Sequence, residues 1–248
     1  MKKIMPAIFL ILSLAFTACS KSSVPSSKYI ASTSWIAGIA ELAGIDDVTV
    51  LAPLNLTHPA EYEITPDDIL TVKNAELVMH AGYERMVKVM SAATDVDNSK
   101  LMKVKTTNTL ENLSNMVTML SEKAGTQTEA QKRFGEYKIL IEETRAQIVT
   151  TGLNKKTVYA NVNQAEFARD LGLNVVATFG SGPLTAEQIA DAAEKKYDII
   201  IDNIHNPVAA PAMEVSPSSK LLVWRNFPEK IEKNALYNVI KENCESLF

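Results

Sequence analysis

The feature of this sequence that most restricts its fold is a repeated alternation of short strand-like and helix-like segments. In the first part of the chain the two types alternate over residues 28–33, 34–44, 47–53, 65–75 and 76–82. After Gly152 the alternation restarts over residues 156–162, 164–172, 174–180, 184–196, 197–203, 220–226 and 229–245. Strands that alternate with helices form parallel sheets whose faces the helices cover. The sequence therefore predicts an α/β fold with one parallel sheet in each half.

A long helix-like segment, residues 126–149, separates the two halves. Phe134, Tyr137, Ile141 and Ile148 recur at helical spacing and form an apolar stripe on one face. At about 1.5 Å per residue such a helix is roughly 35 Å long, comparable with a small domain. It is either a packing helix or a rod between two lobes. The predicted organisation is an N-terminal α/β lobe at 29–122, a linking helix at 123–152 and a C-terminal α/β lobe at 153–248.

The N-terminus has the pattern of an export signal. Lys2 and Lys3 precede an apolar run from Ile4 to Phe16, which is shorter than the about 20 residues that a membrane-spanning helix needs. The run ends in the letters LAFTAC, which resemble a bacterial lipobox, in which Cys19 becomes the lipidated first residue. We expect a signal peptide at 1–18 and a lipid-anchored cysteine with a serine-rich, flexible tether at 19–28. The alternative is an ordinary signal peptide with an incidental cysteine.

Cysteine content and charge exclude several classes of function. Cys244 is the only other cysteine, so a mature chain lipidated at Cys19 contains neither an internal disulfide nor a thiolate metal cluster. We expect Cys244 to be a small buried or half-buried apolar residue. Acidic residues outnumber basic ones, 29 to 25, which disfavours nucleic acid as a partner.

Each of the three histidines follows or ends a predicted strand. His58 lies in the loop after residues 47–53, His80 ends the strand-like segment LVMH, and His205 follows the segment DIIIDN. In proteins with open parallel sheets, ligands bind in crevices at the carboxyl ends of the strands. Imidazole is a common ligand of zinc and other transition metals. We therefore predict a metal site at His58, His80 and His205, although each histidine alone is equally compatible with a solvated loop or a hydrogen-bonded core position.

Four polar residues near these histidines are candidates for further metal ligands or for groups that orient an imidazole. Glu61 and Glu63 flank Tyr62 just after His58, and Asp202 and Asn203 end the strand before His205. A carboxylate that accepts a hydrogen bond from a metal-bound imidazole fixes the orientation of its ring. The simpler interpretation of Glu61 and Glu63 is that both are solvated loop residues.

Much of the mature chain resembles one family of transport proteins. The stretch VTVLAPLNLTHPAEYEITPDDILTVKNAELVMHAGYERMV, with looser matches at AEFARDLGL and YDIIIDN, is similar to the metal-binding solute receptors of zinc and manganese ABC importers, the cluster A-I class. The resemblance implies a periplasmic-binding-protein-like fold with two lobes joined by one long helix. It also implies a metal bound between the lobes and an ABC permease as partner. Glu84 matches a glutamate of the family that has a structural role.

The sequence departs from the family at the binding site. Ala60 stands where the family has its first histidine, and the histidine here is His58, two residues earlier. The segment TTNTLENLSNMV lacks the family's second histidine, and Asn161 falls near its third ligand. His80 and His205 are additional histidines, and together with His58, and with Asn161 as a further ligand, they are the candidates for a rebuilt metal site.

These observations lead to two expectations for the function. The first is a monomeric, lipid-anchored receptor on the extracytoplasmic face of the membrane, which captures zinc, or alternatively manganese, for an ABC permease. The second is a receptor of the same fold for a metal chelate or a small organic molecule. A hydrolase is a weaker interpretation, because Gly180-Ser181-Gly182 lacks the full spacing of a nucleophile elbow. We expect no enzyme and no catalytic cofactor.

Overall fold

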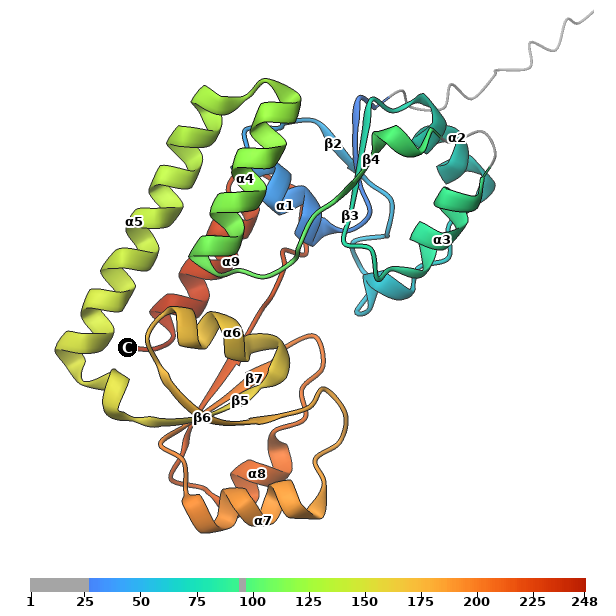
Figure 1. Cartoon of the computed structure of the whole chain (residues 1–248). Coiled ribbons are helices and arrows are strands. Elements are labelled where there is room, and N and C mark those ends of the chain that lie inside the picture. The colour runs from blue at the N-terminus through green and yellow to red at the C-terminus, as the bar shows by residue number, and fades with distance from the viewer. Residues whose placement is uncertain (1–26, 94–96) are drawn as a thin grey trace, which may run out of the picture.

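The computed structural model describes residues 27–93 and 97–248, so Cys19 and the predicted signal peptide lie outside the described residues. Within this part of the chain, two four-stranded sheets form two lobes, joined by long helices along one side (Figure 1). No helix among the described residues combines the length and the apolar character that crossing a membrane requires. The predicted α/β fold, with two parallel sheets and one long linking helix, is confirmed.

The first lobe is built around the sheet with strand order β2-β1-β3-β4, in which all neighbours are parallel. Its strands are β1 (Tyr29–Ala31), β2 (Val48–Val50), β3 (Leu77–His80) and β4 (Leu101–Lys103). The helices between them are α1 (Ser34–Leu42), the short 3-10 helix η1 (Pro59–Glu61), α2 (Pro66–Asn74), α3 (Arg85–Ala92) and the 3-10 helix η2 (Asn98–Lys100). Thr65 caps α2 through a capping box with Asp68, as a Thr-Pro-Asp-Asp start favours.

The second lobe repeats this arrangement with strand order β6-β5-β7-β8, again all parallel. Its strands are β5 (Thr157–Asn161), β6 (Asn174–Phe179), β7 (Ile199–Asn203) and β8 (Lys220–Trp224). Its helices are the 3-10 helix η3 (Leu153–Lys155), α6 (Val162–Asp170), α7 (Ala186–Lys195) and α8 (Ala210–Val215). Every residue of β7 is buried, because helices cover both faces of the sheet.

Three helices run along the side of both lobes. They are α4 (Leu110–Ala124), α5 (Gln127–Thr151) and α9 (Ala235–Glu245). Helix α5 is the long helix that the apolar stripe predicts. Helix α4, which precedes it in the chain, lies beside it, and the two form a helical hairpin (Figure 1). Helix α9 packs against α1 of the first lobe, where the Cβ of Leu236 lies so close to Gly38 that an added Cβ would be 2.9 Å away. The C-terminal helix thus contacts both lobes, because Asn243 also accepts from the backbone N–H of Arg225, just after β8, at 3.0 Å.

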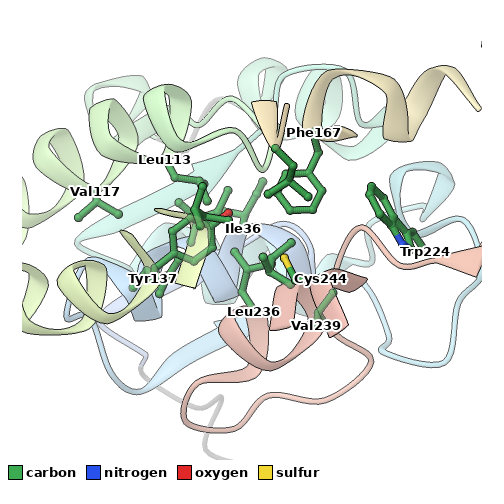
Figure 2. Close-up of a cluster of buried hydrophobic side chains, with 14 of the residues drawn as sticks. Ile36, Leu113, Val117, Tyr137, Phe167, Trp224, Leu236, Val239 and Cys244 are labelled. Carbon is green, nitrogen blue, oxygen red and sulfur yellow. The ribbon is translucent and has the colours of Figure 1, made fainter. Parts of the chain in front are cut away.

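One hydrophobic core connects the lobes and the side helices. Figure 2 shows Ile36 of α1, Tyr137 of α5, Phe167 of α6, Trp224 of β8 and Leu236 of α9 in this cluster. Smaller clusters fill the outer face of each sheet, beneath α2 and α3 in the first lobe and beneath α7 and α8 in the second. Cys244 lies in the main core, as expected, and burial raises the pKa of its thiol to about 11.

Candidate functional site

A cleft of about 710 Å³ lies between the two lobes. Because all the strands are parallel within each sheet, the loops that follow their carboxyl ends face the same region. The first lobe contributes residues after β1, β2, β3 and β4, and the second contributes residues after β5, β6, β7 and β8. The site therefore lies where the predicted topology places ligands.

His58 enters the cleft from the first lobe. It precedes η1, in the loop after β2, and its side chain is exposed. Glu61, the last residue of η1, lines the same cleft. Glu63 is not among the lining residues, and its carboxylate forms an exposed ion pair with Arg85 at 3.3 Å. Of the two glutamates that flank Tyr62, only Glu61 is thus placed to meet a ligand.

His205 enters the cleft from the second lobe, in the loop after β7. Its ring is stacked on that of Phe227, with ring centroids 3.7 Å apart and planes inclined by 6°. Burial lowers the pKa of His205 to about 4, and the charge of Arg225 acts in the same direction. Nε2 is buried without a hydrogen-bond partner among the described residues. The imidazole is therefore neutral at physiological pH and has a nitrogen that no protein group occupies.

Asp202 and Asn203 hold the loop that carries His205. The carboxylate of Asp202 is buried and accepts hydrogen bonds from the backbone N–H groups of Val208 at 2.8 Å and Ala209 at 2.7 Å. Asn203 lines the cleft, and its side-chain oxygen accepts from the backbone N–H of His205 at 3.1 Å. Asp202 itself does not line the cleft, and its carboxylate instead holds the backbone of the loop.

His80 is not among the residues that line the cleft. It is the last residue of β3, where its carbonyl accepts a hydrogen bond from the backbone N–H of Val104 at 2.8 Å. Burial lowers the pKa of its half-buried imidazole, and Nδ1 has no partner among the described residues. Within the described ranges, no group of three histidine, cysteine, aspartate or glutamate side chains is placed to hold a metal ion. The structure brings His58 and His205 into one cleft, but not His80.

Asn161 ends β5 and begins α6. Its side-chain oxygen accepts a hydrogen bond from the backbone N–H of Asn163 at 3.0 Å, which makes it the N-cap of that helix. The residue is completely buried and does not line the cleft, although its amide nitrogen has no partner among the described residues. Its observed role is to start the helix that carries Asn163 and Gln164 into the site.

Side-chain amides form a network at the floor of the cleft and connect the lobes. Asn108, in the loop before α4, donates to the backbone oxygen of Asn226 at 2.8 Å and accepts from the indole N–H of Trp35 at 2.8 Å. Gln164 of α6 donates to the side-chain oxygen of Asn226 and, at 3.2 Å, to the backbone oxygen of Trp224. Asn226 in turn donates to the backbone oxygen of Asn163 at 3.2 Å.

This network is not predictable from the motifs of the sequence. Asn108 lies in the segment where the resemblance leads one to expect a histidine, and that absence was the only signal available. Asn226 and Gln164 have no motif around them. Their pairing depends on contacts between positions more than sixty residues apart, which spacing along the chain does not reveal.

Ser181 lines the cleft as an exposed residue, and its backbone oxygen accepts a hydrogen bond from the side chain of Asn206.

Glu84 is buried and has the structural role expected of it. Its carboxylate accepts hydrogen bonds from the hydroxyl of Ser32 at 2.5 Å and from the backbone N–H groups of Ala81 and Gly82, each at 2.7 Å. It thereby fixes the turn after β3.

No protein-family model and no curated protein sequence matches the chain. Solved structures do match it. A manganese-bound periplasmic metal-binding protein from Candidatus Liberibacter asiaticus is 17% identical, with a TM-score of 0.63, and the match covers 88% of this chain and 97% of that one.

Two further solved structures have the same fold. The protein FpvC from Pseudomonas aeruginosa, solved with Ni²⁺, is 14% identical over 88% of this chain and 93% of its own, with a TM-score of 0.67. The laminin-binding protein of Streptococcus agalactiae, described as an adhesin with metal-transporting activity, is 13% identical over 89% of this chain and 98% of its own, also with a TM-score of 0.67. At these identities the comparison concerns architecture. The chain therefore has the fold of metal-binding solute-binding proteins, as the sequence resemblance implies.

Proposed function

We propose that this protein is an extracytoplasmic receptor that captures a divalent transition metal in the cleft between its lobes, with His58 and His205 as the imidazole ligands. One observation carries the proposal: these two histidines come from different lobes and line the same cleft. A metal held by both would tie the lobes together. The relatives in fold that were solved with manganese, cadmium or nickel are consistent with such a cargo.

The ligand set favours zinc over manganese as the transported ion. Neutral imidazole suits zinc, copper and nickel, whereas manganese prefers oxygen ligands. His205 is neutral without any need to release a proton on binding, because burial already lowers its pKa to about 4. Glu61 lines the same cleft and adds a negative charge to it, although it forms no three-residue ligand group with the two histidines among the described residues.

The remaining parts of the proposal concern the position of the protein in the cell. We propose that Cys19 anchors the chain to the outer face of the membrane by a lipid, that residues 19–28 form the tether, and that residues 29–122, 123–152 and 153–248 are the first lobe, linking helix and second lobe. The receptor delivers its cargo as a monomer to an ABC permease. The support is the export-signal pattern and the fold, which is that of known solute receptors.

The test is calorimetric titration of the full chain in detergent with Zn²⁺ and with Mn²⁺. We expect His58→Ala and His205→Ala each to weaken Zn²⁺ binding by about tenfold or more, which corresponds to about 1.4 kcal/mol or more. His80→Ala is the matched control, because it removes the same side chain outside the cleft and should leave affinity unchanged. Binding that is equally tight in all three variants would refute the proposal.

A further inference from the structure

The cleft is much larger than a metal ion requires. Its volume of about 710 Å³ lies within the range of roughly 300–1,000 Å³ that is typical of sites for small organic ligands. A four-coordinate ion bound directly by protein side chains is enclosed by ligand atoms at about 2.0–2.3 Å. Two imidazoles in a space of this size leave most of the volume to be filled by something else.

The protein also supplies too few metal ligands. Among the described residues that line the cleft, the charged side chains are two carboxylates, Glu61 and Glu166, and there is no group of three potential ligands at one point. Zinc in structural sites takes four ligands, and nickel and other first-row ions take up to six. With His58 and His205 bound, the remaining positions need donor atoms that come from elsewhere.

The amides at the floor of the cleft do not supply these donors. The side-chain oxygens of Asn108 and Asn226 already accept hydrogen bonds from Trp35 and Gln164, respectively. Their arrangement is complete without a metal, and it sets the separation of the lobes at the floor. The cleft above is therefore a preformed space, which suits a cargo with a shape of its own.

The walls of the cleft suit an organic molecule. Trp35, Phe227 and His205 form a row of rings on one side, with centroids of Trp35 and Phe227 5.8 Å apart and those of Phe227 and His205 3.7 Å apart. Uncharged hydrogen-bonding groups on Asn163, Thr57 and Thr107 line the same space. Aromatic surface with a few polar groups is the usual composition of sites that hold and orient a small molecule.

We propose that the cargo is a divalent transition metal already held by a small organic chelator with nitrogen and oxygen donors. This inference rests on the proposed function, because His58 and His205 provide the remaining two ligands of that metal. The chelator occupies the volume along the aromatic row and the uncharged polar wall. The receptor thus recognises both parts of the complex.

The test is whether the protein-bound metal accepts an exogenous chelator. The full chain in detergent is titrated with Ni²⁺ alone, and with Ni²⁺ premixed at equal concentration with L-histidine or with 2,2′-bipyridine. Native mass spectrometry gives the composition of the complex, and the visible absorption of nickel reports its ligands. We expect a complex of protein, metal and chelator in equal numbers, with affinity about tenfold or more above that for Ni²⁺ alone. The complex should be lost in His58→Ala and His205→Ala and kept in His80→Ala.

The outcomes separate the two proposals. If Ni²⁺ binds through His58 and His205 but both chelators only remove it, without forming a three-part complex, the chelate proposal is wrong and the metal receptor stands. If Ni²⁺ binding is the same in His58→Ala and His205→Ala as in the unchanged chain, the proposed function itself fails.

Discussion

At the scale of single residues, the position of His205 depends on a carboxylate that does not face the ligand. Asp202 accepts hydrogen bonds from the backbone N–H groups of Asn203, Val208 and Ala209, at 2.8, 2.8 and 2.7 Å. These bonds close the loop between β7 and α8 in which His205 lies. A buried carboxylate that satisfies three backbone donors fixes the backbone on both sides of the imidazole.

We expect Asp202→Asn to lower the free energy of unfolding by about 2–4 kcal/mol, because an amide NH₂ would then face backbone donors that lose their acceptor. Zn²⁺ affinity should also fall, since His205 is no longer held in place. Urea denaturation and calorimetry measure the two effects. Asp198, just before the first residue of β7, is the matched control: its carboxylate accepts from the backbone N–H of Thr157 at 2.8 Å, and it does not line the cleft. Asp198→Asn should leave Zn²⁺ affinity unchanged. If Asp198→Asn and Asp202→Asn weaken Zn²⁺ binding equally, Asp202 has no specific role in positioning His205.

The sequence was sufficient to predict that His58 and His205 lie in the cleft, because a residue just after a parallel strand lies at the ligand-binding edge of the sheet. The same reasoning applied to His80, which does not line the cleft. Position along a strand fixes the edge that a residue reaches, but successive side chains point to opposite faces, so the direction of the imidazole depends on local geometry. The turn that Glu84 fixes after β3 is part of that geometry.

At the scale of elements, Arg133 attaches the long helix α5 to the first lobe. Its guanidinium contacts three acidic side chains: Glu41 at 3.0 Å, Asp46 at 2.9 Å and Glu129 at 2.8 Å. The side chains of Arg133 and Glu41 are only 10% and 12% exposed. Burial raises the pKa of Glu41, and the charge of Arg133 opposes this increase. The helix that joins the lobes is thereby fixed at the end of α1.

We expect Arg133→Met to lower the free energy of unfolding by about 2–3 kcal/mol at pH 7, because Glu41 loses its partner in a poorly solvated position. Lys138→Met on the same helix removes an exposed ion pair with Glu142 at 3.7 Å and should change stability by less than about 0.5 kcal/mol. Urea denaturation of both variants provides the measurement.

The effect of Arg133→Met should depend on pH. The guanidinium of Arg133 lowers the pKa of Asp46 and of Glu129 below their ordinary values of 3.8 and 4.5. Such groups stabilise the folded state above those ordinary values and lose the contribution as the pH falls through the lowered pKa. The difference in the free energy of unfolding between Arg133→Met and the unchanged chain should therefore shrink below about pH 4. A difference that stays constant down to pH 3 would contradict the ion-pair explanation.

Seven of the eight strands among the described residues were predicted from the sequence, and β4 was not. β4 has three residues, Leu-Met-Lys, with no β-branched residue among them, whereas β1, β2 and β3 each contain valine or isoleucine. The missed helix α4 did have a signal, with Thr109 as N-cap and Leu113, Val117 and Leu120 at helical spacing. Helix α9 begins at Ala235, later than the predicted 229, because Asn234 takes a left-handed backbone conformation just before it.

At the scale of the whole molecule, the two lobes share one core. Tyr137 of the linking helix, Phe167 of the second lobe and Ile36 of the first lobe belong to the same cluster (Figure 2). The alternation of strands and helices was sufficient to predict two lobes. It could not predict that one core spans them, because this depends on how the side helices pack.

We expect a single cooperative thermal transition, because a shared core couples the unfolding of both lobes. Zn²⁺ at about a hundred times its dissociation constant should add about 2.7 kcal/mol of stability and raise Tm by roughly 5–10 °C. Differential scanning calorimetry of the full chain in detergent measures both. The increase in Tm should fall to about half or less in His58→Ala, because tenfold weaker binding leaves about 1.4 kcal/mol of stabilisation at the same Zn²⁺ concentration. Two separate transitions, with only one responding to Zn²⁺, would show that the lobes unfold independently.

The packing of α9 against α1 has a consequence for biogenesis. The last helix of the chain completes the apolar surroundings of the first, with Leu236 seated on Gly38. While the polypeptide is being synthesised from its N-terminus, the first sheet and its neighbouring helices therefore emerge with an unfilled apolar surface. That surface is covered only when helix α9 has been made, so the first lobe completes its packing after synthesis of the second lobe rather than before it.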